Sequence, residues 1–200
     1  MDATIHDVHV GAKQYRVIKA AQPLEGTLLE LGDGWFGEFE AAAIRTLAIA
    51  WAVAARSPHS AVFLPLATTA EPMENLDIVL VHHRLQMPPS KWTSIRRRLG
   101  KGKISRVSVP DSAYLPRSVS GGAYRRPALY HSDKDDLRWV VTGRTLVVVG
   151  SRLAFDDHVR QFAAAARGEL DRPGGEEFCV EIGWHRLDLH LHLRPPNVDH

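Results

Sequence analysis

The residues of this sequence best suited to chemistry lie in a basic segment at 91–106. Seven of its sixteen residues are Lys or Arg, and none is acidic. A guanidinium group is planar and donates hydrogen bonds in a fork that matches phosphate and carboxylate oxygens, so such a run suits an anionic partner. Trp92 stands within the segment, and an indole ring can stack on an unpaired base. The segment therefore predicts a surface for nucleic acid or for an acidic protein.

Further cations extend this prediction on both sides of the basic segment. Arg84 precedes it, and Arg125 and Arg126 follow in a stretch that holds three of the four tyrosines of the chain. The candidate anion-binding residues are Arg84, Lys91, Trp92, Arg97, Arg98, Lys101, Lys103, Arg106, Arg125 and Arg126. A second interpretation stays open, in which the run is a solvated helix face and Trp92 fills the core. The sequence contains no helix-turn-helix pattern, zinc-finger spacing or RNP-type strand that would decide between the two.

The distribution of charge favours an anionic partner. Residues 78–132 contain eleven Lys or Arg and one acid, whereas the rest of the chain contains fourteen basic and twenty-two acidic residues. The balance is +10 in the first part and −8 in the second, although the whole chain carries a formal charge of only +2. A split of this size predicts a positive surface on an otherwise acidic protein.

Histidines near the C-terminus form a second candidate constellation. Asp188, His190 and His192 alternate along an expected strand, so they share one face, and two imidazoles at this spacing can reach a single metal ion. Polar residues also belong on the solvent face of any antiparallel strand whose other face is apolar. The pattern alone therefore assigns no metal ligand.

A third candidate is the pair His82 and His83, followed by Arg84, at the end of an expected central strand. Ligands of open α/β sheets collect at the carboxyl ends of strands, but adjacent strand residues point to opposite faces, so at most one of the two histidines could serve a site there. A histidine satisfied by hydrogen bonds in the core is the competing explanation. Cys179 lies in an apolar strand without a catalytic signature, and phosphate-loop, dinucleotide-binding and hydrolase motifs are missing. We therefore assign no catalytic residue and no cofactor.

Hydrophobic periodicity predicts the elements that position these residues. Strands are expected at 14–20 and 26–31, with a Gly- and Asp-rich turn at 32–37. A helix begins near Glu38 and continues to Arg56, and it is apolar on nearly every face. The other expected elements are strands at 61–67, 76–83 and 103–109, a short helix at 90–100, a hairpin at 137–150 and an amphipathic helix at 152–170.

Three details of these elements can be tested. Pro65 lacks a backbone donor, which predicts an edge position for the strand at 61–67, whereas the strand at 76–83 is apolar on both faces and is expected to be central. In the last strand region, bulky apolar residues are even-numbered at 178–184 and odd-numbered at 187–193. One unbroken strand cannot keep both sets on one face, so a bulge or bend is expected within 183–186.

Together these features predict an α+β fold with a mixed, partly antiparallel sheet, two main helices and a short basic helix. We expect one domain over 1–194 with a long loop at 110–136, and a tail at 195–200. The N-terminus has no secretory pattern, and the most apolar window, 41–55, is short and contains Arg45. A cytoplasmic protein that does not enter a membrane is therefore expected.

The expected function is that of a non-enzymatic binding protein whose basic region, residues 84–126, engages an anionic macromolecule. One alternative is a protein-interaction module such as a bacterial immunity or assembly factor, in which the long loop and exposed aromatic residues form the interface. Another is a metal-dependent enzyme that uses the C-terminal histidines.

Overall fold

The structure is a computed structural model of the 200-residue chain. It describes six stretches of the chain that together hold all the elements discussed below. They are residues 1–31, 34–67, 75–110, 137–166, 179–182 and 189–193, with 111–136 as the longest gap between them.

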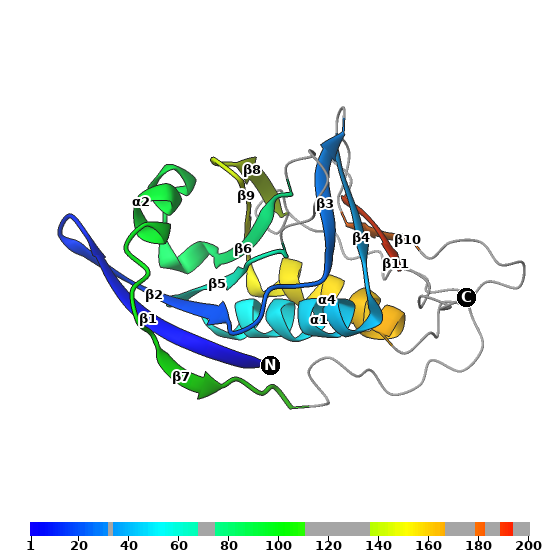
Figure 1. Cartoon of the computed structure of the whole chain (residues 1–200), viewed down its shortest axis with the longest axis horizontal. Coiled ribbons are helices and arrows are strands. Elements are labelled where there is room, and N and C mark those ends of the chain that lie inside the picture. Colours follow the sequence, from blue (N-terminus) through cyan, green and yellow to red (C-terminus); the bar gives the residue numbers. More distant parts are fainter. Residues whose placement is uncertain (32–33, 68–74, 111–136, 167–178, 183–188, 194–200) are drawn as a thin grey trace, which may run out of the picture.

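A seven-stranded mixed sheet organises the fold, in the strand order β7-β1-β2-β5-β6-β9-β8 (Figure 1). The pairs β2–β5 and β6–β9 are parallel, and the other four pairs are antiparallel. The strands are β1 (Asp2–Val10), β2 (Lys13–Ala20), β5 (Ser60–Leu64), β6 (Asp77–His82), β7 (Lys103–Arg106), β8 (Arg138–Val141) and β9 (Thr145–Gly150).

A second, four-stranded sheet has the order β10-β11-β4-β3. Its strands are β3 (Gly26–Leu31), β4 (Gly34–Phe39), β10 (Cys179–Ile182) and β11 (Leu189–Leu193). Leu28, Trp35 and Phe39 of this sheet belong to the same buried cluster as residues of the larger sheet. Trp35 also packs beside Trp139 of β8, with ring centroids 5.6 Å apart. One hydrophobic core therefore joins the two sheets.

Two long helices cover one face of the larger sheet. They are α1 (Ala41–Arg56) and α4 (Arg152–Ala166), which lie against each other (Figure 1). The fully buried Trp51 of α1 meets Phe162 at 4.7 Å and Phe155 at 6.2 Å between ring centroids. α1 is apolar on nearly every side because the sheets and α4 enclose it. A helix that is apolar on nearly every face must be covered on more than one side, and α1 is.

The opposite face of the larger sheet carries a short helical segment. It consists of η1 (His83–Leu85), η2 (Pro89–Lys91) and α2 (Trp92–Arg96). Side chains of the sheet that point away from α1, such as Val79 and Phe63, form a second buried cluster with Trp92 and Ile95. The expected fold class is confirmed: an α+β fold with a mixed sheet, two main helices and a short basic helix.

Two local predictions are wrong. The turn expected at 32–37 overlaps β4, in which Trp35, Gly37 and Phe39 are buried in alternation with half-exposed neighbours. The strand expected at an edge is β5, which is fully buried between β2 and β6. Pro65 does not interfere with pairing because the strand ends at Leu64, and the carbonyl of Pro65 accepts the N–H of Leu24 at 2.8 Å.

The expected central strand is confirmed, whereas the bulge or bend expected within 183–186 lies outside the described residues. β6 lies between β5 and β9 and is buried along its whole length. β10 ends at Ile182, and β11 begins at Leu189 and runs back antiparallel to it, with these two residues paired. Gly183, the expected pivot, lies outside the described residues. The parity change in the sequence therefore marks a reversal of the chain.

Candidate anion-binding surface

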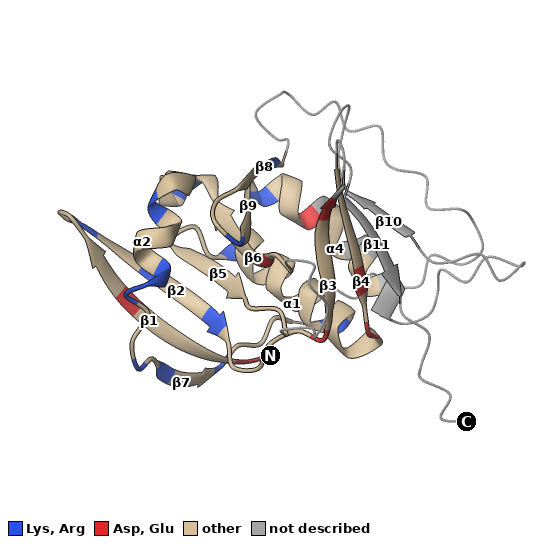
Figure 2. Ribbon diagram, turned by 45° about the horizontal axis from the view of Figure 1, so that its top comes forward, with Lys and Arg blue, Asp and Glu red and all other residues tan. Residues whose placement is uncertain are grey.

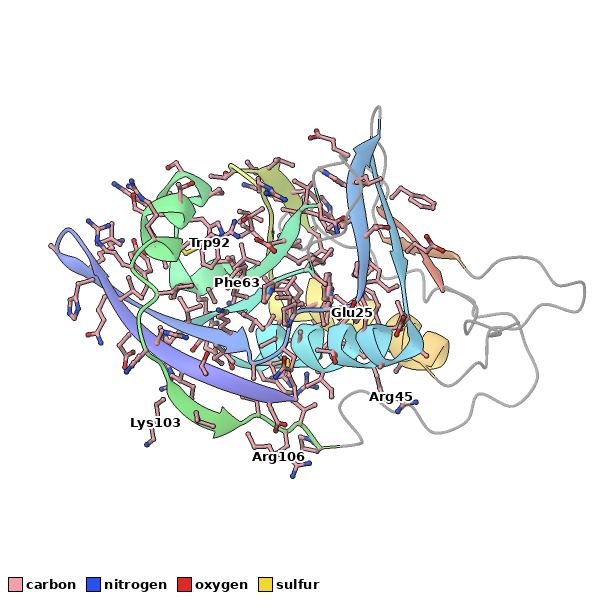
Figure 3. The ribbon with its side chains drawn as sticks, in the orientation of Figure 1. Glu25, Arg45, Phe63, Trp92, Lys103 and Arg106 are labelled. Atoms are coloured by element: carbon pink, nitrogen blue, oxygen red, sulfur yellow. The ribbon has the colours of Figure 1, made fainter. Side chains whose placement is uncertain are left out.

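The short helix α2 positions the arginines of the basic segment. Pro89 lies in the first turn of the preceding helical segment η2, where a missing N–H costs little. Trp92 and Ile95, three residues apart, then fall on one helix face and are fully buried against the sheet. The ring of Trp92 meets the ring of Phe63 at 5.0 Å in an edge-to-face arrangement (Figure 3). Of the remaining helix positions, Thr93 is exposed, and Ser94 and Arg96 are half-buried.

Arg96 is the one arginine of this helix that turns inward. Its Nη2 forms an ion pair with Asp77, its Nη1 donates to Thr145 Oγ1 at 3.2 Å, and its guanidinium lies 5.6 Å from the centre of the Phe63 ring. The other carboxylate oxygen of Asp77 accepts the N–H of Leu66 at 2.8 Å. Arg96 therefore ties α2 to β6 and β9 and is not available to a ligand.

Arg97 and Arg98, by contrast, are exposed, as is Lys91 at the start of the helix. Arg98, in the turn after α2, donates to the carbonyl of Ser94 at 3.3 Å. In the described part of the chain, no ion pair involves any of these three cations. Their charges remain free to meet an external anion.

The chain after α2 adds more cations as it crosses the N-terminal strand. Lys101, Lys103 and Arg106 are exposed, and the last two belong to the edge strand β7. A Cβ on Gly102 would lie 2.6 Å from the ring of His6, so only glycine lets the chain pass this close to β1. Arg106 lies 4.0 Å from Asp2, and both side chains are largely exposed, so this pair adds little stability.

Register divides the cations of β7 between two faces. Lys103 is opposite Ile5, on the α1 side of the sheet, whereas Arg106 is opposite Asp2, on the α2 side. Figure 3 shows both side chains at the rim of the molecule. The cations thus lie on both sides of an edge strand and continue to the ends of α2.

Strand β2 contributes cations that the sequence did not indicate. Lys13 and Lys19 lie on the α2 side of the sheet, opposite Val10 and Thr4 of β1. Nothing in the local pattern links them to the basic segment, because the link is the pairing of β1 with both β2 and β7. Val8, Tyr15 and Val17 face the α2 side of the sheet. Their alternation along the two strands is a sequence feature that indicates on which side Lys13 and Lys19 lie.

Cations outnumber acids around α2, β1, β2 and β7, as Figure 2 shows by colour. Residues 1–20 and 83–106 together hold eleven Lys or Arg and two acids. Glu25, Glu30, Glu38 and Glu40 lie in or beside the second sheet, far from α2 and β7. We call the following cations the basic surface: Lys13, Lys19, Arg84, Lys91, Arg97, Arg98, Lys101, Lys103 and Arg106. All of them are exposed except Lys19, which is half-buried.

The structure places the ten predicted site residues in three different ways. Seven of the ten are exposed cations of the basic surface: Arg84, Lys91, Arg97, Arg98, Lys101, Lys103 and Arg106. Trp92 is fully buried, which agrees with the alternative that it fills the core, so it offers no ring to a base. Arg125 and Arg126 lie outside the described residues.

Chain-wide comparisons add no assignment to this geometry. No known protein family, curated protein or solved structure matches the chain. None of the helices in the described ranges is long and apolar enough to cross a membrane. The residues of the basic surface are therefore the only indication of its chemistry.

His82 ends β6 beside this surface, and His83 begins η1. His82 is buried, and its Nδ1 accepts the N–H of Arg84 at 3.2 Å, while its ring packs against that of the exposed His83 at 4.8 Å. Burial lowers the pKa of His82, and the charges of His83, Arg84 and His59 lower it further. His82 is thus a satisfied core histidine that favours its neutral form.

Stability should decrease as the pH falls, because of His82. Its pKa is lowered in the folded state, so the unfolded chain takes up a proton first as the pH drops through about 6.5. Protonation would also place a proton on Nδ1, which now accepts the Arg84 N–H. We expect urea unfolding to show a smaller loss of stability between about pH 7.5 and 5.5 in His82→Gln than in the wild type. The same change at the exposed His9 should leave the loss unaltered, and equal losses in all three proteins would contradict the assignment.

Proposed function

We propose that the basic surface binds nucleic acid through its phosphate backbone, and that the protein acts by binding and not by catalysis. The proposal rests on one observation: three consecutive arginines, Arg96, Arg97 and Arg98, have different roles in the structure. Arg96 is held by Asp77 inside the fold, and this anchors the helix that presents Arg97 and Arg98 to solvent. Guanidinium groups that follow directly on an anchored helix lose less conformational freedom when they meet phosphates than groups on a free chain do.

The shape of the basic surface favours a long polyanion over a compact anion. Its cations reach from α2, around the edge strand β7, to the ends of β2 (Figure 2). A nucleic acid carries closely spaced phosphates that can meet such a series of cations in turn. Trp92 is buried, so stacking by this residue does not contribute. Binding is therefore expected to depend on the backbone and to show little sequence preference.

Fluorescence anisotropy with labelled duplex and single-stranded DNA tests this proposal. The variant Arg97→Ala/Arg98→Ala should bind every sequence more weakly, and the slope of log affinity against log salt should flatten by about 2 units on duplex DNA, one for each lost phosphate contact. The matched control is Arg45→Ala/Arg138→Ala, which removes two exposed arginines from α1 and β8. It should lower affinity much less than the first variant.

Three outcomes would contradict the proposal. Wild-type protein could fail to bind either nucleic acid at low salt, the two double variants could weaken binding equally, or the affinity of the first variant could match that of the wild type. If the protein binds a labelled polyglutamate peptide but not DNA in the same assay, the acidic-protein alternative is supported instead. The two explanations are thereby separated in one titration series.

A further inference from the structure

Strand β7 leaves one side of the seven-stranded sheet open. It is the first strand in the sheet order, so β1 pairs with it on one side, and no other element of the described ranges pairs with it on the other (Figure 1). An edge strand exposes a row of backbone N–H and C=O groups to which a further strand can be added. The outer side of β7 is therefore a candidate binding edge.

The pairing of β1 with β7 fixes which backbone groups of β7 point outward. Just beyond the strand, the Met1 ammonium donates to the carbonyl of Val107, and the N–H of Val107 donates to the carbonyl of Met1, each at 3.0 Å. Hydrogen-bonded pairs of this kind alternate with non-bonded pairs along an antiparallel ladder. The pairs that include Ile104 and Arg106 are therefore non-bonded. The N–H and C=O groups of these two residues consequently point away from β1, into the open side of the sheet.

The side chains of β7 define what an added strand must contain. Ile104 is 84% exposed, more than any other large apolar side chain among the described residues. Lys103 and Arg106 are exposed cations before and after it, and the one acid opposite β7 in register is Asp2, 4.0 Å from Arg106. An apolar residue opposite Ile104 would cover it, and acids opposite the two cations would pair with them.

We propose that the open edge of β7 binds an acidic, extended segment of another protein as an added antiparallel strand. Opposite Arg106, Ser105, Ile104 and Lys103, in this order, the incoming strand presents an acid, any residue, a β-branched apolar residue and a second acid. The peptide sequence Glu-Thr-Val-Glu has this pattern. Backbone hydrogen bonds to Ile104 and Arg106 hold the strand, and the side-chain pairs select it.

Charge disfavours a second copy of this chain as the occupant of the edge. Pairing of two β7 strands would bring Lys103 and Arg106 of one chain close to the same cations of the other, and like charges on neighbouring strands are destabilising. The opposite edge strand, β8, contains a single cation, Arg138, so it suits an acidic strand less well than β7 does. The proposal does not depend on nucleic-acid binding by the basic surface, so either can fail alone.

Fluorescence anisotropy with a labelled, capped peptide that contains Glu-Thr-Val-Glu tests the proposal. Ile104→Pro removes an outward N–H at a position where an edge strand tolerates proline, and it should weaken peptide binding by about 10-fold or more. Ile104→Ala keeps the N–H and should weaken binding by no more than about 5-fold. Because neither variant changes a charge, the DNA affinity of both should equal that of wild type.

Exchange of charge between protein and peptide tests the preference for acids. Lys103→Glu/Arg106→Glu should weaken binding of the acidic peptide by about 10-fold, and it should bind a peptide with Lys-Thr-Val-Lys more tightly than wild type does. The control is Arg45→Glu/Arg138→Glu, which makes the same change in net charge at exposed arginines of α1 and β8. It should alter both affinities much less.

Amide hydrogen exchange followed by NMR locates the peptide on wild-type protein. The N–H groups of Ile104 and Arg106 should exchange more slowly in the complex, whereas that of Ser105, which is bonded to β1, should change little. Should Ile104→Pro not fold, this measurement still decides the result.

The proposal is overturned if the peptide does not bind wild type at low salt, or if exchange at Ile104 and Arg106 is the same with and without it. It is also overturned if folded Ile104→Pro binds the peptide as tightly as wild type. Sedimentation that shows a dimer of wild type, lost in Ile104→Pro, would assign the edge to a second copy of the chain and would equally overturn it.

Discussion

Replacing Trp92 with alanine is expected to destabilise the protein by about 3 to 5 kcal/mol, the range for truncation of a large buried aromatic residue. Trp92 is fully buried, meets Phe63 edge to face, and joins α2 to the second buried cluster. Few other side chains hold this short helix to the sheet, so the cavity would not close easily. Equilibrium unfolding in urea, followed by circular dichroism, measures the loss.

The neighbouring residue Lys91 provides the matched control for Trp92. It is exposed, and Lys91→Ala should change stability by no more than about 0.5 kcal/mol. Trp92→Ala should also weaken DNA binding at temperatures where the protein stays folded, because Arg97 and Arg98 would lose their fixed support. Equal stability of the two variants would show that α2 is not held as described.

The elements best predicted from the sequence are those whose patterns depend only on their own residues. A central position is predicted for β6 because it is apolar on both faces, through Ile78, Val79, Leu80 and Val81. The structure confirms it. The hairpin of β8 and β9 follows from two apolar runs around a short turn, in which Gly143 adopts a positive φ of 58°. In both places local propensity and tertiary environment agree.

Elements whose stability comes from distant partners were missed or misplaced. β1 contains Asp2, His6, Asp7 and His9, which weaken any strand pattern, but pairing on both sides by β2 and β7 fixes it in the sheet. β4 resembles a turn because of its glycines, yet it pairs with both β3 and β11. In each case tertiary pairing overrides a weak or misleading local preference.

The same distinction applies to the candidate sites. Helical spacing puts Trp92 and Ile95 on a face away from Arg97 and Arg98, as the structure has them, because that spacing is local. The site prediction nevertheless counted Trp92 among the anion-binding residues, and its burial excludes that role. The inward role of Arg96 was not visible, since its partner Asp77 is on another element. Lys13 and Lys19 joined the basic surface only through sheet register.

The ion pair of Arg96 and Asp77 connects the stability of the fold to the basic surface. The side chain of Asp77 is 11% exposed and that of Arg96 is 40% exposed, so solvent screens the arginine more than the acid. Removing Asp77 would leave the N–H of Leu66 without its acceptor in a buried position. The unsatisfied donor is the larger loss, because Arg96 can turn toward water.

Asp77→Ala is therefore expected to lower the free energy of unfolding by about 1 to 3 kcal/mol, the cost of an unsatisfied buried donor, with a smaller addition from the broken ion pair. Asp77→Asn keeps an oxygen acceptor for Leu66 while it removes the charge, so its loss should be clearly smaller.

Both Asp77 variants also release the guanidinium of Arg96, which raises the positive charge beside Arg97. DNA affinity of folded Asp77→Asn should consequently equal or exceed that of wild type, and its salt dependence should steepen by up to about 1 unit. Asp7→Ala, which removes an exposed acid from β1, controls for the change in net charge. Urea unfolding and anisotropy on the same preparations provide both readouts. If Asp77→Ala were as stable as wild type, the Asp77 network would not hold α2; if Asp77→Asn bound DNA more weakly, the anchored position of Arg96 would matter more to binding than its released charge.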